Sequence, residues 1–531
     1  MQTNKKQAQY RVFRETYPLC CKIISEEKLQ YLAEQTGSVE LFADTLAETN
    51  AEQQLPEYLA DLARLEYFAS GLKADDTPVP EQTAKLAINP TLQLFENSWK
   101  HLASLLDEDA AVIEPAKGTE SILIWKQPLS GMLKAKAVSS EDLLVLKMAL
   151  EELSPCEVSR QGDVNLSAVE VAIVRALNDG IIIGPESGIK RDFSTTEYAE
   201  IDPAFFSARI FTLQWHITQA CDLHCRHCYD RSQYKSLSLQ QEKAILDVLA
   251  AFCGSHNVHG QVTFTGGNPL LHPHFEQLYR EASERGFSTA ILGNPTSREQ
   301  IERLKAIQPP AFYQVSLEGL ETHNDYMRGA GHFQRVLAFL ELLRELKVYS
   351  MVMLTLTKAN MDQVLPLAEI LRDRVDLFTF NRLSLVGEGV NLVSVDPENF
   401  PAFLKDYAEA VESNPCLGLK ENLLNVIYDR EKKPFFGGCT GYGCGAAFNF
   451  LALLADGTVH ACRKFPSPLG SILYQSFAEI YNSPAAKRYR RGAEECRGCR
   501  LNPVCRGCLA VSHSQGNDIF RQKDPYCFIA G

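Results

Sequence analysis

The most chemically distinctive segment of the chain is a run of three cysteines, Cys221-Asp-Leu-His-Cys225-Arg-His-Cys228. Such tight spacing in a large chain indicates metal or iron–sulfur ligation rather than a disulfide framework. Three thiolates can bind three irons of a [4Fe–4S] cluster and leave the fourth iron open, as a catalytic zinc keeps one free position. These cysteines are therefore candidate catalytic residues. A zinc site with His224 or His227 as fourth ligand is the alternative interpretation.

Eight further cysteines cluster near the end of the chain. They are Cys439, Cys444, Cys462, Cys496, Cys499, Cys505, Cys508 and Cys527. The two C-x2-C pairs also fit a zinc ribbon, so the spacing alone leaves both metals open. The remaining cysteines stand outside these groups and carry no predicted role. They are Cys20, Cys21, Cys156, Cys253 and Cys416.

The residues around the first cysteine run predict alternating strands and helices. A strand at 210–217 leads into the cysteines, and a strand at 261–265 ends in Gly266-Gly267-Asn268-Pro269. Further strands are expected at 288–292, 312–317, 349–356 and 376–384, with helices at 238–252, 273–285, 297–307, 332–346 and 361–372. This alternation predicts a parallel sheet, closed or partly closed into a barrel. The cysteines and the Gly-Gly turn then face the barrel mouth.

Together these motifs resemble the radical S-adenosylmethionine (SAM) enzymes. A third segment, Val315-Ser-Leu-Glu-Gly through Arg328-Gly329, resembles their fourth-strand motif, and the resemblance spans about residues 208–390. It implies an α/β fold with a partial (β/α)6 TIM-like barrel. It also implies that SAM binds the open iron and yields a 5′-deoxyadenosyl radical that abstracts hydrogen. The hard chemistry then belongs to the cofactor, while the protein supplies position and excludes solvent.

The same resemblance suggests residues that contact SAM. His227 lies where the family places a residue beside the adenine, and Gly266 and Gly267 would let the backbone approach the methionyl amine. Asn268 replaces the more common Glu of this turn, and it can accept from an ammonium without charge assistance. Three weaker candidates for cofactor contacts are Ser316, Asn294 and Arg382.

The C-terminal cysteines resemble the SPASM extension of radical SAM peptide-modifying enzymes, which carries two auxiliary [4Fe–4S] clusters. The match assigns Cys439, Cys444, Cys462 and Cys508 to the first cluster. It assigns Cys496, Cys499, Cys505 and Cys527 to the second, so the chain would hold three clusters. The spacing before Cys508 is x2 where the family usually has x3. A hairpin with an Asp456-Gly457 turn is expected to bring Cys444 and Cys462 together.

The first 200 residues hold all of the net charge. They contain 19 Lys and Arg and 32 Asp and Glu, whereas the rest of the chain contains 34 of each. An acidic surface disfavours a nucleic-acid partner, because phosphates bind basic faces. Apolar residues at helical spacing over 54–70 and 93–106 predict a helical domain. Residues 40–190 resemble a partner-protein family of metal-binding peptide maturation systems.

Residues 121–205 predict a small winged-helix-like unit, with strands over 121–136, helices over 141–153 and 168–178 and the short strand after Gly180. Such a unit could hold a leader peptide by strand addition, although a plain structural domain fits equally well. The expected domains are then four: a mostly helical region at 1–120, this unit at 121–205, the barrel at 206–400 and the SPASM domain at 401–531.

We therefore expect a radical SAM/SPASM enzyme that modifies a ribosomally synthesised precursor peptide, forming a thioether or another Cys-derived product. The layout is similar to maturases of selenobiotic-type and other cysteine-rich peptides. One alternative is a sulfatase-maturing enzyme, although Arg463 stands where that group has a basic Asp. A non-catalytic iron–sulfur electron carrier is the other. The expected partners are the peptide and a flavodoxin- or ferredoxin-like electron donor, with no nucleic acid and no membrane. We expect a cytoplasmic protein.

Overall fold

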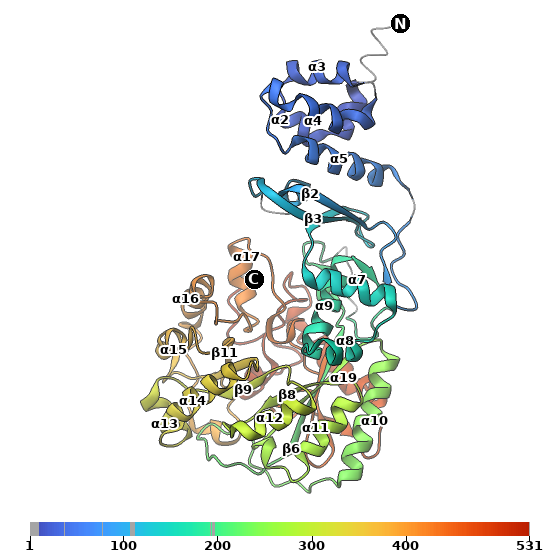
Figure 1. Cartoon of the computed structure of the whole chain (residues 1–531). Coiled ribbons are helices and arrows are strands. Elements are labelled where there is room, and N and C mark those ends of the chain that lie inside the picture. The colour runs from blue at the N-terminus through green and yellow to red at the C-terminus, as the bar shows by residue number, and fades with distance from the viewer. Residues whose placement is uncertain are drawn as a thin grey trace. The chain divides into compact units, whose positions relative to one another are not determined.

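The computed structural model describes residues 10–36, 38–76, 78–106, 112–191, 193 and 197–529 (Figure 1). The chain forms two compact units. The first comprises residues 1–158 with 169–186, and the second comprises residues 159–168 with 187–531.

The first unit begins with a helical bundle. Its helices are α2 (Pro18–Ile23), α3 (Glu26–Gln35), α4 (Phe42–Gln53) and α5 (Leu59–Ala74). They enclose a core in which the rings of Phe13, Tyr17 and Phe42 lie within 5.5 Å of one another. This part of the chain confirms the helix expected over 54–70.

An antiparallel sheet follows, made of β2 (Gln93–Lys100), β3 (Ala116–Lys126) and β4 (Leu133–Ala137), in the order β2-β3-β4. The prediction of a helix over 93–106 is wrong, because residues 93–100 form β2. Only α6 (Ala103–Leu106) is helical within that window. The long apolar strand β3 takes β2 as its hydrogen-bonded partner, and this non-local pairing overrides the local spacing of apolar residues.

Three helices follow this sheet: α7 (Ser140–Glu151), α8 (Pro155–Gly162) and α9 (Leu166–Asp179). Leu123 and Trp125 of β3 pack with apolar side chains of these helices, while Ile122 and Ile124 on the other face of β3 share a cluster with Leu65 of α5. A short antiparallel pair joins β1 (Ala87–Ile88) and β5 (Ile182–Ile183). The winged-helix-like pattern therefore includes β2, which lies before the expected boundary at 121.

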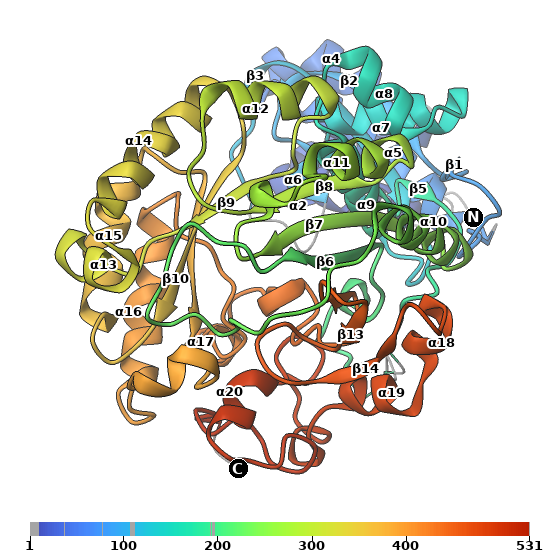
Figure 2. The same ribbon diagram turned by 90° about the horizontal axis from the view of Figure 1, so that it is seen from below.

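The second unit contains the predicted partial barrel. Six parallel strands are ordered β11-β10-β9-β8-β7-β6. They are β6 (Ile210–Thr218), β7 (His259–Gly266), β8 (Ser288–Leu292), β9 (Tyr313–Ser316), β10 (Ser350–Leu356) and β11 (Leu377–Arg382). Figure 2 shows the helices on the outer side of this curved sheet. They are α10 (Leu239–Ser255), α11 (Phe275–Glu284), α12 (Arg298–Ile307), α13 (Glu321–Arg328), α14 (His332–Glu345) and α15 (Val364–Leu371).

The cysteine-rich C-terminal part extends the barrel sheet. The expected hairpin forms from β12 (Phe450–Leu453) and β13 (Thr458–His460), and β14 (Pro468–Ser471) continues it. β12 pairs in parallel with β6, so one sheet runs from the barrel into this part, which the sequence did not indicate. Helices complete it: α16 (Phe400–Ser413), α17 (Leu424–Arg430), α18 (Phe477–Asn482), α19 (Pro484–Arg491) and α20 (Leu509–Ser514).

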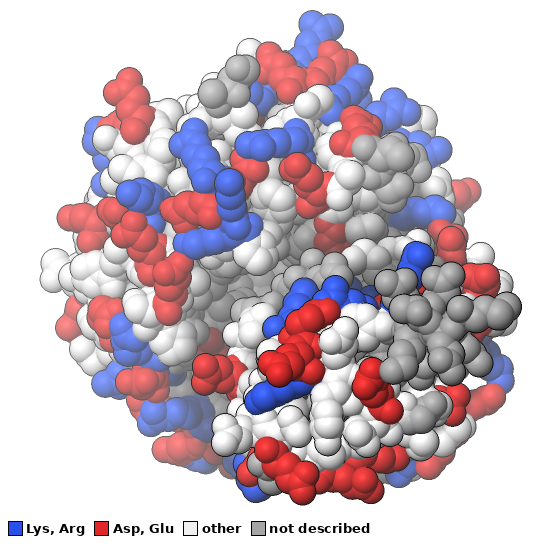
Figure 3. Space-filling view, turned by 90° about the horizontal axis from the view of Figure 1, so that it is seen from above, with Lys and Arg blue, Asp and Glu red and all other residues white. Residues whose placement is uncertain are grey.

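The described helices include none that is both long and apolar enough to cross a membrane. In the view of Figure 3, Asp and Glu side chains are spread over the surface and intermixed with Lys and Arg.

Candidate active site

The segment from Cys221 to Cys228 leaves the end of β6 and is held by backbone contacts. The N–H of Arg226 donates to the carbonyl of Met327 at 3.0 Å, and the carbonyl of Cys228 accepts from the N–H of Glu388 at 2.8 Å. The loop is therefore fastened to segments that follow β9 and β11.

Two of the thiols in this loop have N–H donors at their sulfur atoms. Arg328 Nη1 lies 3.7 Å from Cys225 Sγ, and Asn294 Nδ2 lies 3.8 Å from Cys221 Sγ. Burial raises the pKa of Cys225, and the charge of Arg328 opposes that rise. Donors aimed at sulfur are the contacts through which a protein tunes an iron–sulfur cluster.

Glu318, which follows β9, is fully buried and organises this side of the site. Its Oε1 accepts from Arg328 Nε and Nη2 at 2.9 and 2.6 Å and lies 3.2 Å from His227 Nε2. Its Oε2 accepts from the N–H of Thr355 at 2.8 Å. Burial alone would raise the pKa of Glu318, but His227 and Arg328 outweigh it and hold this pKa far below its usual range.

The Gly-Gly turn at the end of β7 packs directly on the cysteine loop. The N–H of Gly267 donates to the carbonyl of Thr218 at 2.8 Å, and the N–H of Asn268 donates to that of Ala220 at 2.7 Å. A Cβ on Gly267 would lie 2.3 Å from the Ala220 oxygen, and one on Gly266 would lie 2.2 Å from the Thr218 oxygen. Both glycines are therefore required for this close approach.

Asp222 joins two of the predicted cofactor contacts. Its Oδ1 accepts from Asn268 Nδ2 at 3.0 Å and from Asn294 Nδ2 at 2.6 Å. Asn268 Oδ1 in turn accepts from the N–H of Leu270 at 3.3 Å. The structure thus assigns both asparagines a role in holding the cysteine loop, and their contact with a cofactor stays a prediction.

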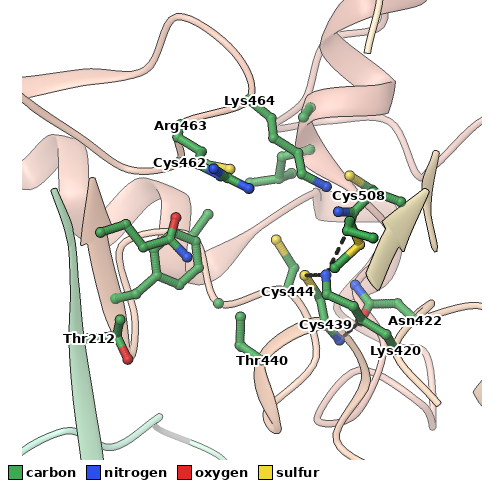
Figure 4. A pocket seen from close by; sticks show the side chains of 18 of the residues that line it. Thr212, Lys420, Asn422, Cys439, Thr440, Cys444, Cys462, Arg463, Lys464 and Cys508 are labelled. Atoms are coloured by element: carbon green, nitrogen blue, oxygen red, sulfur yellow. Dashed lines mark hydrogen bonds between the residues drawn. The ribbon is translucent and has the colours of Figure 1, made fainter. Parts of the chain in front are cut away.

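A cavity of about 260 Å³ lies inside the second unit, between the inner face of the barrel and the C-terminal cysteines. Polar side chains from the strands line one side, among them Gln214, Gln261 and Gln314. Four cysteines line the other side (Figure 4): Cys439, Cys444, Cys462 and Cys508. These are the four that the resemblance to the SPASM extension assigned to one cluster.

The other four C-terminal cysteines are also neighbours. Burial and the thiols of Cys499 and Cys527 raise the pKa of Cys496 to about 11. Burial raises the pKa of Cys499 and Cys505 as well, and the charge of Cys527 contributes to both shifts. Within the described ranges, no three His, Cys, Asp or Glu side chains are gathered closely enough to hold one metal ion.

Comparison with known families decides between iron and zinc for this arrangement. Residues 215–371 match the radical SAM superfamily, and residues 444–509 match SPASM, an iron–sulfur cluster-binding domain. The chain is a radical SAM enzyme with a SPASM domain. SAM and iron–sulfur clusters are therefore its cofactors, and the zinc and non-catalytic alternatives fall away.

Characterised relatives of this radical SAM enzyme differ in their named functions. The AdoMet-dependent heme synthase of Methanosarcina barkeri is 25% identical over 343 residues, which cover 59% of this chain and 95% of that protein. The antilisterial bacteriocin subtilosin biosynthesis protein AlbA of Bacillus subtilis is 24% identical over 315 residues, which cover 55% of this chain and 66% of AlbA. The structure of Streptococcus suis SuiB bound to precursor peptide SuiA shares the fold, with a TM-score of 0.51 and 16% identity. The match covers 77% of this chain and 96% of the SuiB chain.

Arg382 is the last residue of β11, the sixth strand of the barrel, as expected. Its guanidinium donates to Glu421 at 3.0 and 3.0 Å and to Asp524 at 2.9 and 2.6 Å. Asp524 Oδ2 also accepts from the N–H of Cys508 at 2.8 Å. Through Asp524, Arg382 links β11 to Cys508, and its contact with SAM stays a prediction.

The other predicted residues are placed as follows. Ser316 ends β9 and is half-buried, and His227 lies between Glu318 and Arg328. Sequence reasoning did not assign roles to Glu318 and Arg328, although both lie within the motif from Val315 to Gly329. A charged pair of opposite sign inside a strand-end motif was the available signal.

Proposed function

We propose that this radical SAM/SPASM enzyme modifies a ribosomally synthesised precursor peptide by hydrogen abstraction, giving a thioether or another Cys-derived product. The observation that carries the proposal is the cavity that connects the barrel interior with Cys439, Cys444, Cys462 and Cys508. Its amide side chains can donate to and accept from peptide groups, which suits a polypeptide segment. The similarity to AlbA, a bacteriocin biosynthesis protein, supports the same class of substrate.

The residues of the radical SAM loop fit a cluster with bound SAM. Three thiols come from one loop, donors face two of the sulfurs, and His227 Nδ1 is buried with no hydrogen-bond partner among the described residues. We propose Cys221, Cys225 and Cys228 as ligands, with His227 beside the nucleoside. When bound and reduced, this group supplies the 5′-deoxyadenosyl radical. The chain's own part is to orient the loop through Glu318 and Arg328 and to exclude water.

We further propose three [4Fe–4S] clusters in all. The two SPASM sets have complete thiol complements, namely Cys439, Cys444, Cys462 and Cys508, and Cys496, Cys499, Cys505 and Cys527. The shared lining of one cavity supports the first set, and the mutual influence of the thiols on their pKa values supports the second. Their role would be to accept an electron from the substrate or to bind a substrate thiolate.

The sheet β2-β3-β4 of the first unit is our proposed leader-binding element. On β2, the N–H of Ser98 donates to Asp61 Oδ2 at 2.9 Å. The Asp61 side chain therefore occupies part of the edge of β2 that faces away from β3. Among the described residues, β4 pairs with β3 alone. A strand of peptide added beside β4 would use backbone hydrogen bonds for affinity. An external flavodoxin- or ferredoxin-like donor in the cytoplasm completes the proposed system, without nucleic acid or membrane.

A second candidate function follows from the heme synthase of M. barkeri, because this chain covers 95% of that protein. In that case a porphyrin rather than a peptide would occupy the cavity. The sulfatase-maturing alternative gains no support from the site, since Arg463 follows Cys462 where that chemistry needs a basic carboxylate.

The test is anaerobic turnover of the reconstituted enzyme. With SAM and a reductant, we expect 5′-deoxyadenosine by mass spectrometry, and Cys221→Ala should abolish it. Cysteine-containing peptides encoded beside the gene should then change mass, whereas Fe-coproporphyrin should not be consumed. Nucleoside formation with conversion of the porphyrin and of no peptide would overturn the proposal.

A further inference from the structure

Arg463 occupies the space between the two kinds of cluster site. It directly follows Cys462 and lines the cavity. Its Nη1 donates to Thr265 Oγ1 on β7 at 3.3 Å, and its guanidinium carbon lies 5.9 Å from the centre of the Tyr229 ring. Because Tyr229 follows Cys228 and Arg463 follows Cys462, this contact joins the radical SAM loop to the segment of the SPASM ligands.

The cavity contains more positive than negative charge. Its lining includes Lys420, Arg463 and Lys464, and its single acidic residue, Glu421, is held by Arg382. Among the described residues, no carboxylate lies within 4.0 Å of the guanidinium of Arg463. A buried or half-buried cation without an anion loses hydration and gains no Coulomb energy in return.

The two lysines have an evident counter-charge, whereas Arg463 does not. Lys420 Nζ lies 3.4 Å from Cys439 Sγ. Lys464 lines the same cavity as Cys439 and Cys508 (Figure 4). Both lysines therefore face the ligands of an anionic cluster. Arg463 instead donates to Thr265 near the end of β7.

The groups that surround Arg463 are neutral. Burial, with the charge of Arg463, lowers the pKa of His216 to about 3, so this imidazole is uncharged at neutral pH. The aromatic ring of Tyr229 faces the guanidinium and offers no anion. Thr265 adds only a hydroxyl. The hydrogen-bond and ring contacts of Arg463 are thus with uncharged groups, inside the cavity.

We infer that Arg463 binds a carboxylate of the substrate, so that the modified peptide carries an Asp or Glu side chain close to the reacting residue. This inference rests on the proposed peptide function. The planar guanidinium offers paired N–H donors that match a carboxylate, and such charge-assisted contacts fix orientation as well as affinity. The acidic side chain would hold the neighbouring residue between the radical SAM loop and the first SPASM cluster.

The test is affinity selection with the fully reconstituted enzyme and SAM under anaerobic conditions. The probe is a library of N-acetylated, C-amidated pentapeptides with cysteine at the centre and random flanking residues. We expect peptides with Asp or Glu to bind about tenfold to a hundredfold more tightly than their Asn or Gln counterparts. Arg463→Gln should remove that difference, and Arg463→Lys should keep part of it.

Arg488→Gln is the matched control, because Arg488 stacks on Phe520 outside the cavity. It should leave the acid preference intact. Iron content and the EPR-monitored reduction potentials separate the inference from a structural role. If Arg463→Gln loses iron or shifts a potential while the acid preference persists, the residue serves the cluster and the inference is wrong.

The remaining outcomes distinguish this inference from the proposed function. Peptide binding and mass change without any acid preference would overturn the inference and leave the function standing. Acid-selective binding without a mass change under turnover conditions would support the carboxylate site and count against peptide modification. If the wild-type enzyme retains no pentapeptide, the inference is overturned, whereas the proposed function is decided by the mass change of full-length peptides that carry a leader.

Discussion

A single buried carboxylate, Glu318, connects three features of the radical SAM site. It pairs with Arg328, lies beside His227 and accepts from the backbone of β10. Arg328 in turn reaches Cys225 Sγ. The orientation of the cysteine loop therefore depends on one charge that is compensated from two sides.

We expect Glu318→Gln to weaken the site without unfolding the protein. The substitution keeps the shape of the side chain but leaves Arg328 and His227 without their anion. Iron bound per chain and 5′-deoxyadenosine formation should both fall, by about tenfold for the nucleoside, since a hydrogen bond to a charged group contributes about 1.5–3 kcal/mol. Glu321→Gln on the adjacent helix serves as control, and an equal loss in that variant would contradict the prediction.

Arg382 gives a second prediction, which separates a structural role from SAM binding. Arg382→Met leaves Glu421 and Asp524 buried without a cation, so the free energy of unfolding of the second unit should fall by about 3–5 kcal/mol. Urea titration measures this change. The exposed pair of Lys405 with Glu409 is the control, because Lys405→Met should cost about 1 kcal/mol or less. A weaker SAM affinity in Arg382→Met with unchanged stability would restore the cofactor role.

At the scale of elements, the β7 turn and the loop after β6 meet backbone to backbone. Two backbone hydrogen bonds join them, and no side chain separates the two backbones at Gly266 and Gly267. The glycines that we assigned to the methionyl amine also serve to bring these two strand ends together.

Gly267→Ala should therefore disrupt the radical SAM cluster. The added methyl group would meet the Ala220 carbonyl oxygen, and relief of that contact must move the cysteine loop. We expect loss of the site's iron and of SAM cleavage, while the SPASM cysteines keep theirs, as measured by Mössbauer or EPR quantification. Gly254→Ala in α10 is the control, since its Cβ would meet nothing within 4 Å. Full retention of cluster in Gly267→Ala would refute this argument.

At the scale of the whole molecule, buried neutral histidines couple stability to pH. Burial, with the charge of Arg328 opposing protonation, lowers the pKa of His332 to about 4, and burial lowers that of His259 to about 4. Unfolded histidines titrate near 6.5. The contribution of these histidines to the free energy of unfolding is complete above pH 6.5. It is lost as the pH falls toward 4, because in that range only the unfolded chain takes up the protons.

The melting temperature of the cluster-free protein should thus fall between pH 7.5 and pH 5. His332→Gln should reduce the size of that fall, because one of the titrating groups is removed. The exposed His274 is the control, and His274→Gln should leave the pH dependence as it is in the wild type. A melting temperature that rises on acidification would contradict the assignment.

The sequence alone predicted the order of strands and helices from 210 to 384, because each of these elements has its own apolar periodicity and its own turn residues. It also predicted the groups of cysteines, since ligand spacing is a local property of the chain. The β12–β6 pairing, the double carboxylate around Arg382 and the strand at 93–100 depended on partners far away in sequence. No local pattern encodes such pairings, because the energy that selects them arises only when distant segments pack together.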